Sequence, residues 1–320
     1  MGISTQTTLT PLLKQNNTTP NGPIDLLFRE VDFLNVLRES GRVEDSQGAE
    51  PLTWNVTTAG NGSAEVFAEG AAPPVAGNET QTTASLSTFA VRTVYGLTRG
   101  AQINNEKRGY LGNAQEIESL GAEKALFKKI EDELMGSTAD RGIASIIDAT
   151  GTYAGLSQGT YSIWASNETN VGGALTLAVL QTLVEDMTNG TVGGIARGAT
   201  PTHFLMPQNQ ISNYLALFGP SAGASSLVRM MPGHTDAGSG LGKGRYDYDA
   251  GAITIARCRS MTTTEIYLVD IMDMMLIQHG PLEEKEIVGN PQNIQFEVSS
   301  RHFFQVKSRN KHGKLTGVTA

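Results

Sequence analysis

A polar stretch with two adjacent prolines separates two strand-like segments early in this chain, and it limits the folds available. Residues 65–96 read EVFAEGAAPPVAGNETQTTASLSTFAVRTVYG. Alternating residues predict two extended arms over residues 52–70 and 82–97. At about 3.3 Å per residue, such arms reach on the order of 50 Å. An isolated two-stranded ribbon is only marginally stable in water, so we expect this one to lie on another surface.

The arms carry apolar side chains that would be exposed on a free ribbon, which favours coverage by a neighbouring copy. The tip, Ala-Ala-Pro-Pro, lacks backbone donors at its prolines and ends the ribbon without inviting further strand pairing. Within the first arm, the Gly60-Asn61-Gly62 sequence predicts a turn between two strands of residues 51–68. The residues predicted to contact a neighbouring subunit from this extended loop are Trp54, Glu65, Phe67, Glu69, Pro73, Pro74 and Phe89.

Charge is divided between this loop and the end of the chain. Residues 43–91 contain six acids and no lysine or arginine, whereas residues 298–320 contain basic residues and no acid. A head-to-tail interface would use such complementarity, and contacts of this kind close into rings or extend into lattices. The alternative is that both regions are simply solvated. The basic residues predicted to contact a neighbour from the terminal strands are Arg301, Lys307 and Arg309.

Periodicity predicts the remaining elements. Residues 24–40 show helical spacing, and residues 114–136 predict the longest helix, with Ile117, Leu120, Phe127, Ile130 and Leu134 on one stripe and charges elsewhere. Further helices are predicted within residues 175–187 and 208–219. Strands are predicted at 202–207, 250–261 and 264–271, and a terminal hairpin of two long strands is predicted to turn near residues 311–313.

Composition excludes several classes of protein. The net charge of −8 argues against a sequence-independent DNA-binding protein, which needs clustered basic residues. The single cysteine, Cys258, allows no internal disulfide. From the first residues we expect no signal peptide, and no apolar run in the sequence approaches the roughly 20 residues of a membrane span.

No enzymatic site is predicted. Residues 219–223 match the GxSxG pattern around Ser221, but a helix precedes them and Pro220 adjoins the serine, so a turn of small residues is the better interpretation. Residues 238–244 lack the spacing of a phosphate-binding loop. The five histidines have no metal-ligand spacing, and we expect no metal and no cofactor.

The order of elements resembles the major capsid protein of tailed bacteriophages, with its Hong Kong 97-type fold. The resemblance rests on Trp54 before AEVFAEGAAPP, on the strand that leads through RTVYGLTRG into the long helix, on HFLMPQNQISNYLALFG, and on the ending from EKEIVGNPQNIQFEVSSRHFFQV onward. It extends over most of the chain from about residue 23.

The resemblance implies an α+β, Hong Kong 97-like fold built from four parts. These are an N-terminal arm and short helix (1–48), an extended loop (49–100), a peripheral domain with the spine helix and terminal strands (101–150 plus 285–320), and an axial α/β domain (151–284). It also implies a non-enzymatic capsid protein whose hexamers and pentamers form an icosahedral shell around double-stranded DNA, without sequence-specific binding. Such a protein is a virion component assembled in the host cytoplasm.

Partners and rivals follow from the same resemblance. Scaffolding, portal and cementing proteins are possible partners, and no membrane is involved. Some relatives crosslink a loop lysine to a neighbour's asparagine, but residues 43–91 contain no lysine, so we expect no such crosslink.

The rival interpretations are an encapsulin-like compartment, another virion protein such as a tail-tube or decoration protein, and an esterase using Ser221.

Overall fold

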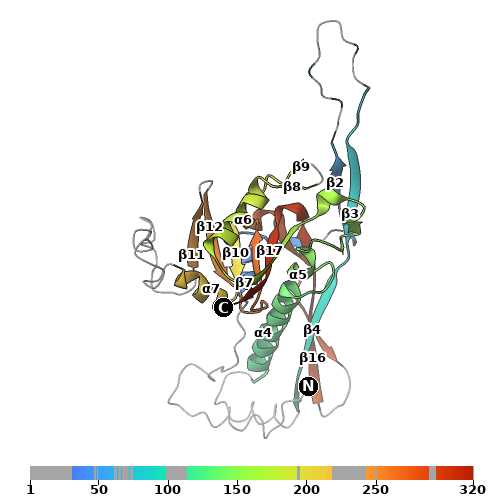
Figure 1. Cartoon of the computed structure of the whole chain (residues 1–320). Helices are drawn as coiled ribbons and strands as arrows, with labels where there is room; N and C mark the ends of the chain where they lie inside the picture. Colours follow the sequence, from blue (N-terminus) through green and yellow to red (C-terminus); the bar gives the residue numbers. More distant parts are fainter. Residues whose placement is uncertain are drawn as a thin grey trace.

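A long ribbon projects from a body that contains two β-sheets (Figure 1). Figure 1 draws a computed structural model of the chain. The described residues are 31–46, 48, 50–60, 63, 66, 72, 75–98, 114–192, 195–217, 243–248, 251–287 and 293–319.

The first sheet is organised around one long strand, β16 (Asn293–Val306). Strand β4 (Phe89–Thr98) pairs along one edge of β16, antiparallel. The other edge of β16 pairs with β15 (Glu283–Ile287) and then with β14 (Met274–His279). Strand β1 (Val43–Ser46) adds to β14 in parallel and completes a five-stranded sheet.

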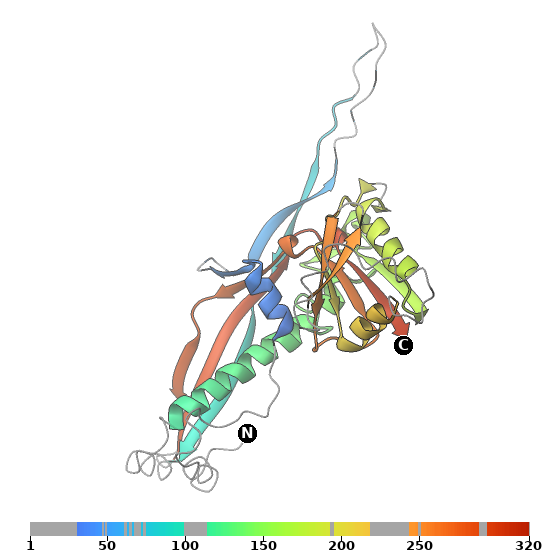
Figure 2. The same ribbon diagram turned by 90° about the vertical axis from the view of Figure 1, so that its left-hand side faces the viewer.

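The predicted spine helix, α4 (Ala114–Met135), runs beside β4 and β16 (Figure 2). Of the predicted stripe, Ile130 and Leu134 are buried, and Ile117 and Phe127 are partly buried. Leu126, which was not predicted, is buried as well. Two details differ from the predicted stripe: Leu120 is 51% exposed, and Glu131, which was expected on the charged face, is fully buried. The short helix α2 (Asp32–Glu39) packs near α4 and buries Phe33, Leu34 and Leu37.

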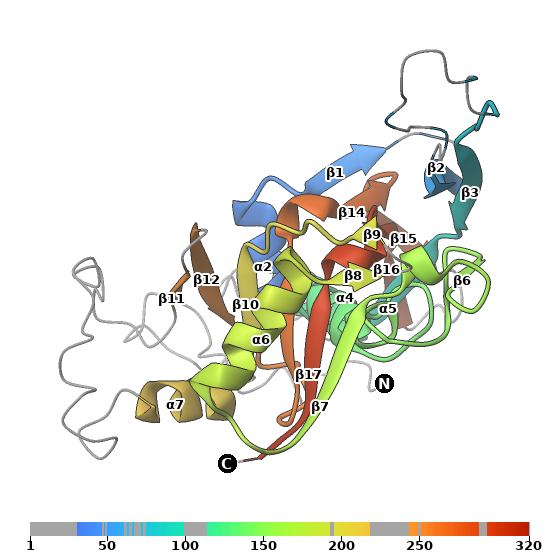
Figure 3. The same cartoon turned by 45° about the horizontal axis from the view of Figure 1, so that its top comes forward.

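The second sheet has six strands in the order β11-β12-β10-β13-β17-β7. Its two faces enter different cores, because successive side chains of a strand point to opposite faces. In β10, Phe204 and Met206 pack under the helices α6 and α7, whereas Leu205 joins the core of the spine helix. Figure 3 shows α6 in front of β10 and β17. The bounds are β7 Asn167–Ala174, β10 His203–Met206, β11 Lys243–Tyr248, β12 Gly251–Arg257, β13 Ile266–Val269, β17 Gly313–Thr319, α6 Leu177–Thr188 and α7 Gln208–Ala216.

Smaller elements lie between the larger ones along the chain. They are α5 Ile143–Ile146, β5 Thr152–Tyr153, β6 Leu156–Ser157, η1 Ser162–Trp164, β8 Thr191–Val192, β9 Ile195–Ala196, η5 Ile271–Asp273 and η6 Arg309–Lys311. None of the helices in the described ranges is long and apolar enough to cross a membrane.

Within the described residues, the ribbon consists of two paired strands. Strands β2 (Leu52–Ala59) and β3 (Thr80–Leu86) pair antiparallel as a sheet of their own. The first of the two strands predicted within residues 51–68 is β2, and its partner is β3. Most of the predicted turn and of the second strand lies outside the described residues. The second predicted arm, 82–97, is divided, because β4 leaves the ribbon and pairs with β16.

The predicted terminal hairpin is also wrong. Strand β16 lies in the five-stranded sheet, whereas β17 pairs with β13 and β7 in the six-stranded sheet. The turn η6 carries the chain from one sheet to the other. The strands after residue 285 are therefore divided between the two sheets. Strand β14 belongs to the five-stranded sheet, although its residues fall in the range predicted for the axial domain.

Candidate functional site

The inner part of the ribbon packs on its own body. Leu52, Trp54 and Val56 alternate with exposed residues along β2 and lie against the core of the spine helix. The ring of Trp54 contacts Tyr153, with centroids 6.4 Å apart, and Tyr153 stacks in turn on Trp164 at 6.2 Å. Tyr153 donates a hydrogen bond from its hydroxyl to the Phe304 carbonyl, so this row of rings attaches the ribbon root to β16.

The root is also held at its base by Glu50. Its carboxylate accepts hydrogen bonds from the Thr88 backbone N–H (3.1 Å) and the Thr88 hydroxyl (2.6 Å). These two bonds hold the pKa of Glu50 below its usual value, and the charges of His279 and Arg301 act in the same direction. Arg301, predicted to contact a neighbour, is exposed and lies near this acid of its own chain.

Two predicted contact residues lie inside the protomer instead. Phe89 is only 5% exposed, packs against the His302 ring at 5.7 Å and lies under the Arg141 guanidinium. Arg309 is completely buried and donates to the carbonyls of residues 145, 146, 148 and 150. Neither side chain leaves surface for a neighbour, which corrects both predictions. Burial lowers the pKa of Arg309 to about 10, so it stays charged at neutral pH.

The other predicted residues fall into two groups. Trp54 and Lys307 line one pocket, described next, and Lys307 is exposed. Glu65, Phe67, Glu69, Pro73 and Pro74 lie outside the described residues.

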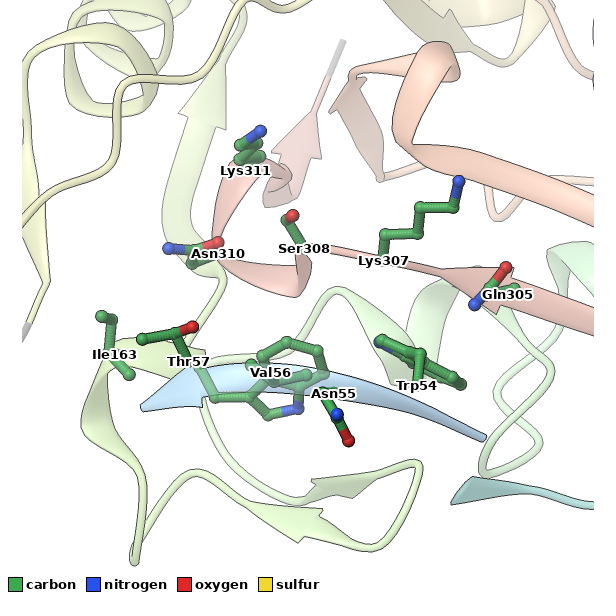
Figure 4. Close-up of a pocket in the computed structure, with 11 residues that line it drawn as sticks. Trp54, Asn55, Val56, Thr57, Ile163, Gln305, Lys307, Ser308, Asn310 and Lys311 are labelled. Atoms are coloured by element: carbon green, nitrogen blue, oxygen red, sulfur yellow. The ribbon is translucent and has the colours of Figure 1, made fainter. Parts of the chain in front are cut away.

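A pocket of about 500 Å³ lies between β2 and the segment that joins β16 to β17. Figure 4 shows β2 along one side and Lys307, Ser308, Asn310 and Lys311 along the other. The apolar side chains in its wall are Trp54, Val56, Ile163 and Trp164. Sequence patterns gave no signal for Trp164, because only the fold brings η1 beside the ribbon root.

The structure describes only some of the groups that the sequence offered for enzymatic chemistry. No group of three or more His, Cys, Asp or Glu side chains could hold a metal within them. The Cys258 thiol is buried, which raises its pKa and makes it a poor nucleophile. Ser221 and the glycine-rich stretch at 238–242 lie outside the described residues, while Lys243 and Gly244, predicted as loop, belong to β11.

Comparison with known proteins decides the family. Residues 32–319 match the family described as SU10 major capsid protein. The chain belongs to this family. It is a structural subunit of a viral shell, as the order of its elements predicted, and no curated protein sequence matches it.

Solved structures agree on the fold of the capsid protein. A chain from the cyanophage A-1(L) capsid asymmetric unit is similar over 98% of this chain and 99% of its own, with a TM-score of 0.71 and 16% identity. The capsid of the native GTA particle is similar over 95% and 96%, with a TM-score of 0.61 and 11% identity. The predicted α+β, Hong Kong 97-like fold is therefore confirmed.

One similar structure is an encapsulin complex. The holo-SrpI encapsulin complex from Synechococcus elongatus PCC 7942 is similar over 95% of the capsid protein and 92% of its own chain, with a TM-score of 0.57 and 12% identity. At this identity the likeness concerns the fold alone.

Proposed function

We propose that this capsid protein assembles as hexamers and pentamers into an icosahedral shell around double-stranded DNA, with the outer part of each ribbon lying on a neighbouring copy. The ribbon carries the proposal. Within the described residues, β2 and β3 pair as strands only with each other, and on the outer edge of β3 the Ser85 N–H donates to the Ala154 carbonyl near the body. The edges farther out along the ribbon are free to pair with a further chain. Two valines beyond the paired strands, Val66 and Val75, are 103% and 91% exposed.

The enclosed DNA would be held without sequence-specific contacts and without catalysis. A net charge of −8 is unsuited to tight general binding of phosphates, so the DNA would be confined by the closed shell. Assembly would take place in the host cytoplasm, with scaffolding, portal and cementing functions supplied by other proteins. The four-part division into arm, extended loop, peripheral domain and axial domain belongs to the same proposal.

Replacement of residues 61–78 by a short Gly-Ser linker tests the role of the ribbon. We expect a folded subunit, with the circular dichroism of the natural protein, that no longer forms shells in negative-stain micrographs. A control variant with a linker of equal composition inserted after residue 78 keeps the natural loop. Normal shells from the shortened variant would contradict the proposed role.

A second candidate, a compartment that encloses protein cargo, is favoured by the encapsulin-like fold. The two functions differ in content. Particles purified from infected cells should carry nucleic acid, visible as a high ratio of absorbance at 260 nm to that at 280 nm. Particles that hold a stoichiometric protein and no nucleic acid would favour the compartment.

A further inference from the structure

The turn between β5 and β6 has a strained backbone. Its two central residues are Ala154 and Gly155, and both have a positive φ, of 52° and 77°. Two-residue turns of this kind ordinarily take Asn, Asp or Gly at the first position, because a Cβ atom crowds the following carbonyl there. Ala154 has no polar side chain to make a local hydrogen bond, and it is completely buried. The turn therefore needs bonds from other segments to keep this conformation.

Two hydrogen bonds hold the backbone of Ala154. Its N–H donates to the Asp140 carboxylate at 2.9 Å, and its carbonyl accepts from the Ser85 N–H, also at 2.9 Å. Asp140 follows the spine helix and itself has a φ of 64°, which Asp adopts more readily than most residues. Ser85 belongs to strand β3 of the ribbon. The strained turn thus links the end of the spine helix to the ribbon.

Adjacent residues of the turn hold different strands of the ribbon. The Tyr153 ring contacts Trp54 of β2, whereas Ala154 accepts the hydrogen bond from Ser85 of β3. Tyr153 is itself fixed to β16, because its hydroxyl accepts a hydrogen bond of 2.7 Å from the Val306 N–H. The body therefore grips both strands of the ribbon at one place.

This grip is small compared with the length of ribbon that it directs. Among the described residues, the Ser85 bond is the single backbone hydrogen bond that joins β2 or β3 to the body. From Ser85, β3 extends five residues outward to Thr80, which is roughly 16 Å at the rise of a strand. Over that length, a swing of about 10° at the root moves Thr80 by about 3 Å. Figure 1 shows how β2 and β3 project from the body.

We propose that the β5–β6 turn is a releasable clamp that sets the direction in which the ribbon leaves the body. The structure shows the closed clamp. Release breaks the bond between Ser85 and Ala154 and allows the turn to leave its strained conformation, so the strain offsets part of the free energy that the bond contributes. Asp140 is a positioning residue, since it acts on the ribbon through the turn.

A proline substitution can remove the clamp bond and leave the pairing of the ribbon intact. The N–H and C=O of a strand residue point to the same edge, so the Ser85 N–H, which donates to Ala154, faces away from β2. Ser85→Pro removes this donor. Thr83→Pro is the matched control, because Thr83 lies two residues earlier on the same edge and is also exposed. Its N–H makes no hydrogen bond to the body within the described part of the chain.

The direction of the ribbon is measured as a distance between two spin labels. Cysteines introduced by Thr80→Cys and Lys285→Cys, both at exposed positions, carry the labels, while the natural Cys258 is buried. Double electron–electron resonance on full-length, unassembled subunits should give one narrow distance distribution. We expect Ser85→Pro to widen it by about 3 Å or more, as the lever of about 16 Å predicts, and Thr83→Pro to leave it narrow.

A second pair of variants tests the clamp from the side of Asp140. Asp140→Gly permits the positive φ and removes the acceptor for the Ala154 N–H, so it should widen the distribution. Asp140→Asn keeps an acceptor oxygen and tolerates the same φ, so it should preserve the narrow distribution. Circular dichroism verifies that each variant folds. If Ser85→Pro does not fold, the two Asp140 variants decide the question.

Two results would overturn the proposal. The first is a distribution in Asp140→Gly that is as narrow as that of the natural protein. The second is equal widening in Ser85→Pro and Thr83→Pro, since proline itself, and not the lost bond, would then loosen the ribbon. Because all of these measurements use unassembled subunits, neither result bears on the proposed function, which the ribbon replacement tests separately.

Discussion

The Glu131 carboxylate accepts a hydrogen bond of 2.9 Å from the backbone N–H of Phe33, a residue 98 positions earlier in the chain. Its second oxygen accepts from the backbone N–H of Leu34, also at 2.9 Å. Helix α2 begins at Asp32, so these are two of the N–H groups that a helix leaves without an intrahelical partner. The spine helix thus caps α2 through a buried side chain.

Removal of this cap should destabilise the subunit. We expect Glu131→Ala to lower the free energy of unfolding by about 2–4 kcal/mol, because two buried N–H groups lose their acceptor. Urea denaturation of unassembled subunits measures the change. Asp132→Ala, at the exposed neighbouring position, loses only an ion pair with Lys128 and should cost about 0.5 kcal/mol or less. Equal effects of the two substitutions would contradict the role of Glu131.

The same carboxyl should make stability depend on pH. Burial raises the pKa of Glu131 to about 7, while the two backbone hydrogen bonds act against this rise. The folded state therefore holds this proton more tightly than the unfolded state, and its contribution is present at low pH and is lost as pH rises from about 4.5 to about 7. Glu131→Gln should remove that dependence. The free energies of unfolding of both proteins are measured at pH 5 and at pH 8. The natural protein should lose more stability between these pH values than Glu131→Gln does, and an equal loss in the two proteins would contradict the raised pKa.

A buried histidine acts in the opposite direction. His312 is completely buried, accepts a hydrogen bond at Nδ1 from the Asp270 backbone N–H, and has its pKa lowered to about 3 by burial and by the nearby charge of Lys311. The unfolded state then binds the proton more readily, so stability is fully present above pH 6.5 and is lost as pH falls towards 3. Asp273, 3.9 Å away, is the acid that faces its other ring nitrogen.

We expect His312→Asn, which retains an acceptor near Nδ1, to flatten the loss of stability between pH 6.5 and pH 4. Thermal unfolding of unassembled subunits at several pH values measures it. His203→Asn is a suitable comparison, because His203 is only partly buried and its pKa is lowered by burial alone. An unchanged acid profile in His312→Asn would show that other groups, such as the buried His302, control it.

Sequence patterns predicted where helices and strands occur better than they predicted which strands pair with each other. Local periodicity defines α4 and β10 because each buries one face or one run of side chains. Strand pairing is a contact between distant residues, and nothing local distinguishes a hairpin of β16 and β17 from two strands in separate sheets. Arg309 is an example of a contact that no local pattern predicts. A basic residue near the end of the chain is expected to be exposed, but its guanidinium is buried and donates hydrogen bonds to carbonyls within residues 145–150.

The candidate site was predictable only in part. Charge separation along the sequence pointed to Lys307, and the ribbon pointed to Trp54. The pocket also needs Trp164, which the chain brings beside Trp54 through the fully buried ring of Tyr153. Phe89 was misplaced because an alternating strand looks the same whether its apolar face meets a neighbouring subunit or its own sheet.

Substitution of Arg309 should therefore damage folding rather than assembly. Arg309→Lys cannot reproduce the planar fork that serves several carbonyls at once, and we expect a loss of about 3 kcal/mol or more in the free energy of unfolding. Lys307→Ala, two residues earlier and exposed, should leave the unassembled subunit within about 0.5 kcal/mol of the natural protein. Chemical denaturation compares the two variants. Arg309→Lys subunits of full stability that fail only to form shells would return Arg309 to the interface.

Mature shells should be held together without covalent bonds between subunits. The extended loop has no lysine between residues 43 and 91, so no amine is available there to attack a neighbour's asparagine. Shells boiled in denaturant should therefore migrate at the 34.1 kDa of one chain on a denaturing gel. A ladder of larger species would place a crosslinking amine elsewhere in the chain.

Because exposed ion pairs are screened by salt, the same shells should dissociate more readily at high ionic strength if contacts such as Lys307 with the acidic loop hold them.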